Sequence, residues 1–153
     1  MSAFASNATY VTVAEAEAYF ATRLNSDWWT ECDLNEKERA LITSTQRIDT
    51  LAFSGYRTVS TQELKFPRSG ETTIPDGVKI ACCELALALI QGWEPEAEIR
   101  NLTVNNEGVA NSRTTYNRDF AQEHVANGFP NQLGWAHLKP YLVEAGGVKI
   151  SRV

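Results

Sequence analysis

The spacing of apolar residues predicts two amphipathic helices in the N-terminal third of the chain. The first runs from Thr12 to about Leu24, and Glu15, three positions after Thr12, completes a capping box at its start. The second runs from about 35 to 53 and is capped by Asp33 or Asn35. The side chains expected on the buried faces are Val13, Ala16, Phe20 and Leu24 in the first helix and Leu41, Thr45, Ile48, Leu51 and Ala52 in the second.

A third predicted helix, residues 78–92, is apolar on every face instead of along one stripe. Pro75 suits its first turn and Gly92 suits its end. A helix of this kind is surrounded by protein. Either the other helices of the chain wrap it, or a neighbouring copy of the chain covers part of it. We take the second alternative, which points towards assembly.

The middle of the chain predicts less regular structure. Residues 57–73 are typical of a long loop, and residues 94–98 are typical of an acidic linker. Two β-like runs, 99–104 and 112–116, flank a turn at 105–108 and predict a hairpin. Because an isolated two-stranded hairpin is marginally stable in water, we expect it to pair with strands of neighbouring subunits.

The complete pattern predicts a mainly α fold, a small helical bundle with a long loop, a β-hairpin and an extended C-terminal tail. A short helix at 131–138, broken near Pro140, precedes a strand-like tail at 148–153. We expect one domain. Residues 1–93 form its helical core with the long loop, and residues 94–153 add the hairpin, the short C-terminal helix and a docking tail.

Composition and motifs exclude several classes of function. A net charge of -5 argues against a whole surface built for nucleic acid, since phosphate binding needs clustered Lys and Arg. The three cysteines and two histidines lack metal-ligand spacing, and no nucleophile or phosphate-loop motif is present. We therefore expect no catalytic residue, cofactor or metal, and no enzyme. Without a signal-peptide pattern or a bilayer-spanning run, we expect synthesis in a cytoplasm.

One acid, Glu84, lies inside the apolar third helix. An unpaired carboxylate is costly to bury, so it must meet a cation, reach solvent or be protonated. We expect a structural ion pair with Arg47, Arg57 or Arg68, and take Arg68 as the partner. Alternatively, Arg68 faces outward and contacts a partner protein or a phosphate.

Five segments in order carry a resemblance to a known family: 10–20, the helix from Leu41 to Leu51, the loop motif Phe66-Pro67-Arg68-Ser69-Gly70, Ile74-Pro75 and Cys83-Glu84-Leu85-Ala86. Together they resemble the small head–tail connector (adaptor) proteins of tailed bacteriophages, a family often labelled "putative DnaT-like single-stranded DNA-binding protein". The resemblance covers Tyr10 to Gly92 well and the remainder loosely.

The resemblance implies a structural adaptor that forms a ring, of about twelve copies, beneath the phage portal. Its partners would be sister chains, the portal and the tail completion or terminator proteins, with DNA passing through the lumen without sequence-specific binding. The protein would reside in the neck of the virion, after assembly in the host cytoplasm, with no membrane contact and no cofactor. The residues assigned to portal docking are Val148, Lys149, Ile150, Ser151, Arg152 and Val153, and those assigned to the subunit interface are Phe66, Pro67, Arg68, Leu102, Val104, Thr114 and Tyr116.

The alternative function is that of a single-stranded DNA-binding, primosome-like replication protein. Trp28 and Trp29, which are otherwise expected to fill the core between helices, would then stack on bases together with Tyr56. Phosphates would be held by Arg57, Lys65 and Arg68. Oligonucleotide binding that weakens as salt rises would distinguish this protein from an adaptor, for which we expect little binding at any salt.

Overall fold

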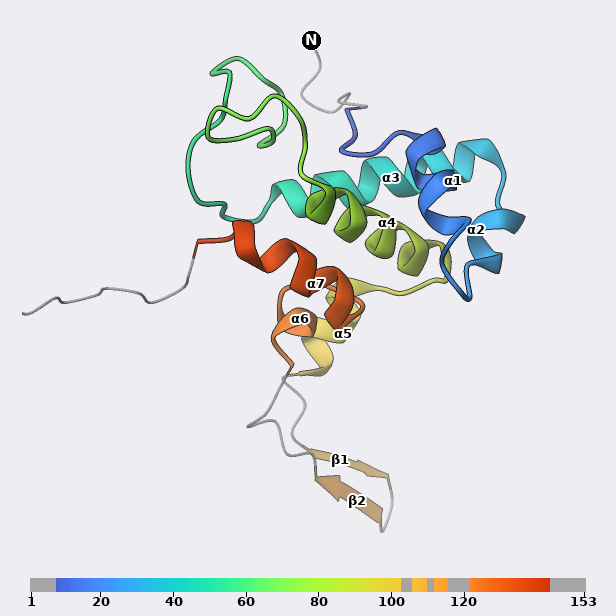
Figure 1. Cartoon of the computed structure of the whole chain (residues 1–153). Helices are drawn as coiled ribbons and strands as arrows, with labels where there is room; N and C mark the ends of the chain where they lie inside the picture. The colour runs from blue at the N-terminus through green and yellow to red at the C-terminus, as the bar shows by residue number, and fades with distance from the viewer. Residues whose placement is uncertain (1–7, 103–105, 110–111, 116–121, 144–153) are drawn as a thin grey trace, which may run out of the picture.

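The computed structural model describes residues 8–102, 106–109, 112–115 and 122–143. This part of the chain is mainly helical, as predicted (Figure 1). Its helices are α1 (Val13–Phe20), α2 (Asp27–Glu31), α3 (Leu34–Asp49), α4 (Asp76–Ile90), α5 (Pro95–Asn101), α6 (Glu123–Ala126) and α7 (Gln132–Leu138), followed by a 3-10 turn at Lys139–Tyr141. No helix among the described residues is both long and apolar enough to cross a bilayer.

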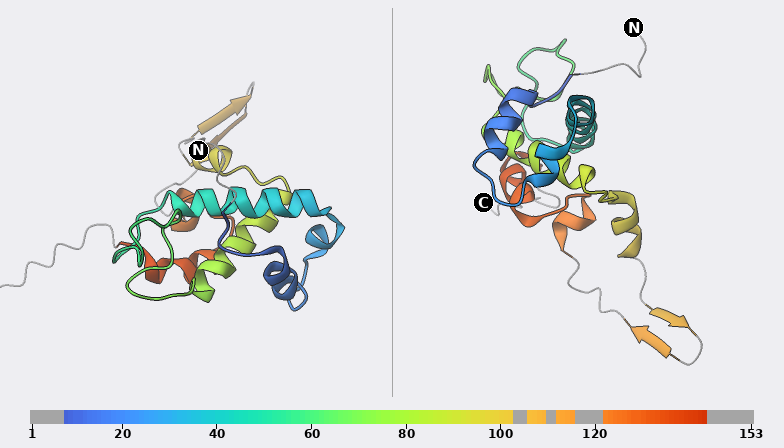
Figure 2. Two further views of the ribbon diagram at one scale, coloured as in Figure 1. Left: turned by 90° about the horizontal axis from the view of Figure 1, so that it is seen from above. Right: turned by 90° about the vertical axis from the view of Figure 1, so that its right-hand side faces the viewer.

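Helix α4 forms the centre of the fold. It lies between α3 and α7, and α1 and α2 also contact it (Figures 1 and 2). Its nine buried residues are covered by these helices of the same chain. The first of the two alternatives for the apolar helix is therefore correct: the chain sheathes α4 by itself, and the apolar helix is no argument for assembly.

The first two predicted helices begin where their caps predict. The side chain of Thr12 accepts from the Glu15 N–H, that of Asp33 accepts from the Glu36 N–H, and both N3 glutamates reach back to complete capping boxes. Helix α1 ends earlier than predicted, so Leu24 is exposed instead of buried. Helix α3 likewise stops at Asp49.

The predicted acidic linker and hairpin are wrong in their bounds. Helix α5 begins at Pro95 and ends at Asn101. It therefore takes up most of the predicted linker and the first half of the predicted first strand. Proline suits this first helical position because its missing N–H would have no partner there. Strand β1 (Asn106–Val109) occupies most of the predicted turn and pairs antiparallel with β2 (Ser112–Thr115). The pair stands clear of the helices (Figures 1 and 2).

Helix α7 packs closely on α4 through two glycines. A Cβ atom at Gly77 would lie 2.6 Å from the backbone oxygen of His137, and one at Gly134 would lie 3.2 Å from Cβ of Glu84. Asn131 caps α7 by accepting from the Gly134 N–H, at 2.7 Å. Because both close contacts involve backbone or Cβ atoms, a side chain at either glycine would push the helices apart.

Candidate functional site

Glu84 accepts hydrogen bonds at both carboxylate oxygens and is a structural group. Its Oε1 accepts from the Tyr19 hydroxyl at 2.6 Å and from Arg23 Nε at 2.5 Å. Its Oε2 accepts from Arg23 Nη2 at 2.9 Å and from Asn131 Nδ2 at 2.8 Å. Burial alone would raise the pKa of this carboxyl, but the hydrogen bonds together outweigh burial and lower the pKa. Four donors use its acceptor capacity, so little remains for a substrate.

The predicted ion pair between Glu84 and Arg68 is wrong. The cationic partner is Arg23, in the turn that follows α1. This turn reaches the buried carboxylate because α1 packs against α4. The pair joins the N-terminal helix to the central one, and Asn131 adds the C-terminal helix to the same contact.

Arg68 holds the long loop together instead of facing a partner. Its guanidinium donates to four backbone carbonyls, those of Phe53 (3.3 Å), Ser54 (2.9 Å), Gly55 (2.6 Å) and Lys65 (3.1 Å). A guanidinium has five N–H donors in a fixed fork, so little capacity remains for a phosphate. The loop is ordered around this side chain.

The predicted subunit interface is largely internal or outside the described residues. Phe66 is 4% exposed and packs edge-on against the rings of Tyr10, Phe53 and Tyr141. With Arg68 it belongs to the fold of its own chain, and Pro67 between them accepts from the Thr58 N–H. Leu102 is half-buried and Thr114 lies on β2. The residues outside the described part of the chain are Val104, Tyr116 and the predicted docking tail, Val148, Lys149, Ile150, Ser151, Arg152 and Val153.

Of the six residues proposed to hold single-stranded DNA, three are accessible for that role. Trp29 is completely buried against Phe20, with ring centroids 4.7 Å apart, and so fills the core as predicted. Lys65 donates to the Leu51 carbonyl at 2.7 Å, and Arg68 is occupied as described above. The accessible members are Trp28 on α2, at 56% exposure, and Tyr56 and Arg57 in the long loop.

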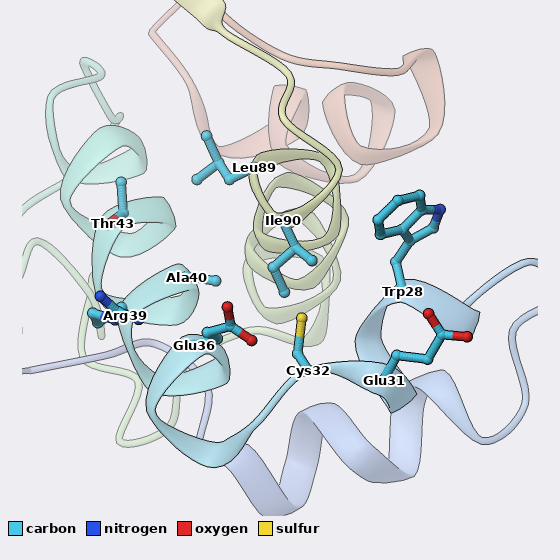
Figure 3. Close-up of a pocket in the computed structure, with 9 residues that line it drawn as sticks. All are labelled: Trp28, Glu31, Cys32, Glu36, Arg39, Ala40, Thr43, Leu89 and Ile90. Carbon is cyan, nitrogen blue, oxygen red and sulfur yellow. The ribbon is translucent and has the colours of Figure 1, made fainter.

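Trp28 forms one wall of an open groove between α2, α3 and the C-terminal end of α4 (Figure 3). The groove has a volume of about 540 Å³, within the range of small-molecule sites. Its floor is apolar and consists of Ala40, Leu89 and Ile90. We call it the Trp28 groove, and its lining residues are Trp28, Glu31, Cys32, Glu36, Arg39, Ala40, Thr43, Leu89 and Ile90.

The rim of the Trp28 groove carries both signs of charge. Arg39, on α3, donates from Nε to the Asn35 carbonyl at 3.3 Å and forms no ion pair with any residue in the described part of the chain. The Oε2 atom of Glu36 accepts from the Asp33 N–H at 3.2 Å as part of the capping box. Partial burial and the nearby Glu36 carboxylate raise the pKa of the Cys32 thiol, so this thiol stays protonated at neutral pH and is only a weak donor.

Trp28 was a candidate for stacking, but its expected role in the core is wrong, since the side chain is exposed. The other residues of its groove were not predicted. Arg39, Leu89 and Ile90 come from two helices separated by the long loop, and no local pattern brings them together. One signal was present: in a helix, adjacent tryptophans point about 100° apart, so the neighbour of a buried tryptophan tends to face outward.

A protein-family model with the description "Putative DnaT-like ssDNA binding protein" matches residues 3–152. The chain belongs to this family. No curated protein and no solved structure matches the chain. Membership in the DnaT-like family rests on nearly the whole sequence, including the parts that carry the Trp28 groove.

This family membership overturns the connector interpretation. The description of the DnaT-like family names single-stranded DNA binding, which agrees with the alternative function and not with a structural component of a virion neck. The portal and tail partners followed from the connector function and fall with it. Association of copies and the location of the protein in the cell are not tested by a single chain and stay predictions.

Proposed function

We propose that the protein binds single-stranded DNA and that the Trp28 groove holds one or two of its bases. The observation that carries this proposal is the exposed indole of Trp28 on the wall of an open, apolar-floored groove. Stacking on an aromatic side chain stabilises a bound base by about 1–3 kcal/mol and tolerates any base, because every base has a π face.

A polar stripe on α3 supports the path of a strand away from the groove. Arg39 and Thr43 line the groove, and Gln46 and Thr50 continue the same exposed face towards the long loop. At 100° per residue these four side chains lie within an arc of about 60° and extend over about 16 Å. These four residues supply hydrogen-bonding groups and one guanidinium, and Glu36 lies one turn before Arg39 on the same helix.

The charge of the protein supports weak binding with a shallow salt dependence. The chain carries a net charge of -5, and Arg39 is the cation at the groove without an acidic partner in the described part of the chain. One or two phosphate contacts correspond to a slope of log K against log salt between about -0.7 and -1.4. Base stacking therefore supplies more of the affinity than phosphate contacts.

The test is fluorescence anisotropy of a labelled mixed-sequence oligonucleotide of roughly 15 nucleotides, at low salt. Trp28→Ala removes one stacking surface, and we expect affinity to fall about 5- to 150-fold. Leu133→Ala is the control, because Leu133 is an apolar residue of similar exposure on α7, outside the groove. Arg39→Ala should weaken binding and make the salt slope shallower by about 0.7.

Equal binding by Trp28→Ala and Leu133→Ala would refute the site, and no binding by the unaltered protein would refute the function. The double variant Tyr56→Ala with Arg57→Ala separates the groove from the loop. Both residues are exposed in the loop, at the other end of α3 from α2 (Figure 1). A loss of affinity confined to this variant would place the DNA on the loop instead.

A further inference from the structure

The structure carries one inference about which bases the Trp28 groove accepts. We infer that the groove favours bases with an exocyclic amino group over thymine and, between the two pyrimidines, cytosine over thymine. The inference rests on the proposed function, because it concerns the edge of a base that is already stacked on Trp28.

Two carboxylates face the place where that edge would lie. Glu31 follows Trp28 by three positions on α2, a spacing that puts the two side chains on neighbouring positions of the helix surface. Figure 3 shows the Glu31 carboxylate beside the indole and the Glu36 carboxylate in the mouth of the groove, near Ile90. Glu31 accepts no hydrogen bond within the described part of the chain, whereas the Glu36 carboxylate accepts from the Asp33 N–H and from the Cys32 thiol. Both carboxylate oxygens of Glu31 therefore lack a partner in the described part of the chain.

Ionised carboxylates accept hydrogen bonds and donate none. The 4-amino group of cytosine is a donor that acidic side chains recognise, whereas thymine has a carbonyl oxygen at the same position. A cytosine stacked on Trp28 can donate to Glu31 or Glu36. A thymine in the same pose places an acceptor against an acceptor, and both groups have lost water without gaining a partner.

The donors of the groove lie on the other wall. Arg39 and Thr43 come from α3, across the groove from Trp28 (Figure 3). Phosphates are repelled by the Glu31 carboxylate beside Trp28 and attracted to Arg39. The charge pattern thus orients a strand with its backbone along α3 and its base edges towards α2. With this orientation Glu31 meets the base edge and not the backbone, and Glu36, one turn before Arg39 on α3, meets the base from the mouth of the groove.

The experiment compares labelled oligo-dC and oligo-dT of equal length, at mildly alkaline pH where cytosine is neutral. The two pyrimidines are of similar size and differ at position 4, at N3 and in the 5-methyl group of thymine, so the glutamine variants are needed to assign a preference to the carboxylates. We expect oligo-dC to bind about fivefold more tightly, the lower end of discrimination by one contact to a base. Glu31→Gln, alone and with Glu36→Gln, should bring the ratio towards one, since an amide can also donate to the thymine carbonyl.

Glu38→Gln is the matched control for charge. Glu38 lies on α3 outside the Trp28 groove, so its change removes the same negative charge and should leave the dC-to-dT ratio unaltered. Equal binding of both oligonucleotides, or tighter binding of oligo-dT, overturns the inference and leaves the proposed function standing. A preference for oligo-dC that survives both glutamine changes overturns it too. If neither oligonucleotide binds, the proposed function itself fails.

Discussion

Removing the cation that pairs with Glu84 is the sharpest test of how this fold is held together. In Arg23→Ala the carboxylate keeps only the Tyr19 hydroxyl and the Asn131 amide as donors. Glu84 is 1% exposed, so water cannot replace the guanidinium without moving the helices around α4. The variant therefore leaves a buried charge with half of its hydrogen bonds and no counter-ion.

The size of the effect follows from this geometry. Removing one partner of a buried ion pair costs about 3–5 kcal/mol, because the other charge stays buried. The Arg23 side chain is 27% exposed, which places the pair at the lower end, about 3 kcal/mol. For a chain of 153 residues this corresponds to a decrease of roughly 6–12 °C in Tm.

The assay is urea unfolding followed by circular dichroism, with Arg39→Ala as the control. Arg39 is an exposed arginine without an ion pair in the described part of the chain, so its removal should change the free energy of unfolding by less than about 0.5 kcal/mol. Glu84→Gln added to Arg23→Ala removes the stranded charge and should recover part of the loss. A cost for Arg23→Ala no larger than that of the control would show that the pair does not hold the helices together.

Three further predictions concern the same framework. The hydrogen bonds to Glu84 lower its pKa in the folded state. Its stabilising contribution is therefore present above the unfolded pKa of about 4.3 and is lost as pH falls through the folded pKa. The difference in unfolding free energy between the unaltered protein and Glu84→Gln should shrink in acid. Gly77→Ala places a methyl group 2.6 Å from the His137 carbonyl oxygen and should lower the free energy of unfolding in urea by about 1–3 kcal/mol. The control Ala136→Gly, at an exposed site of α7, should lower it by no more than about 1 kcal/mol. Arg68→Ala leaves four loop carbonyls without their donor and should speed proteolysis between residues 54 and 73. Cleavage no faster than in Arg57→Ala would contradict this role for the guanidinium.

The sequence correctly predicted features that depend on neighbouring residues. The capping box at Thr12 was predicted, and Asp33 was one of two predicted caps of the second helix, because side chain and backbone lie three positions apart and such contacts form whatever surrounds the helix. The apolar character of α4 indicated complete burial, and α4 is buried. Where the prediction failed locally, at Pro95, the same proline is compatible with a linker and with the first position of a helix.

The sequence by itself determined the four helices α1, α3, α4 and α7, and that α4 is enclosed by protein, because periodicity and capping are local properties of the chain. It did not predict α2, α5 and α6, which are short. Only the tertiary structure decided what encloses α4, which arginine reaches Glu84 and which tryptophan of the Trp28-Trp29 pair faces solvent. Each of these depends on how helices distant in sequence dock on one another. The Trp28 groove has the same origin, since its walls come from α2, α3 and α4 and exist only once those helices are packed.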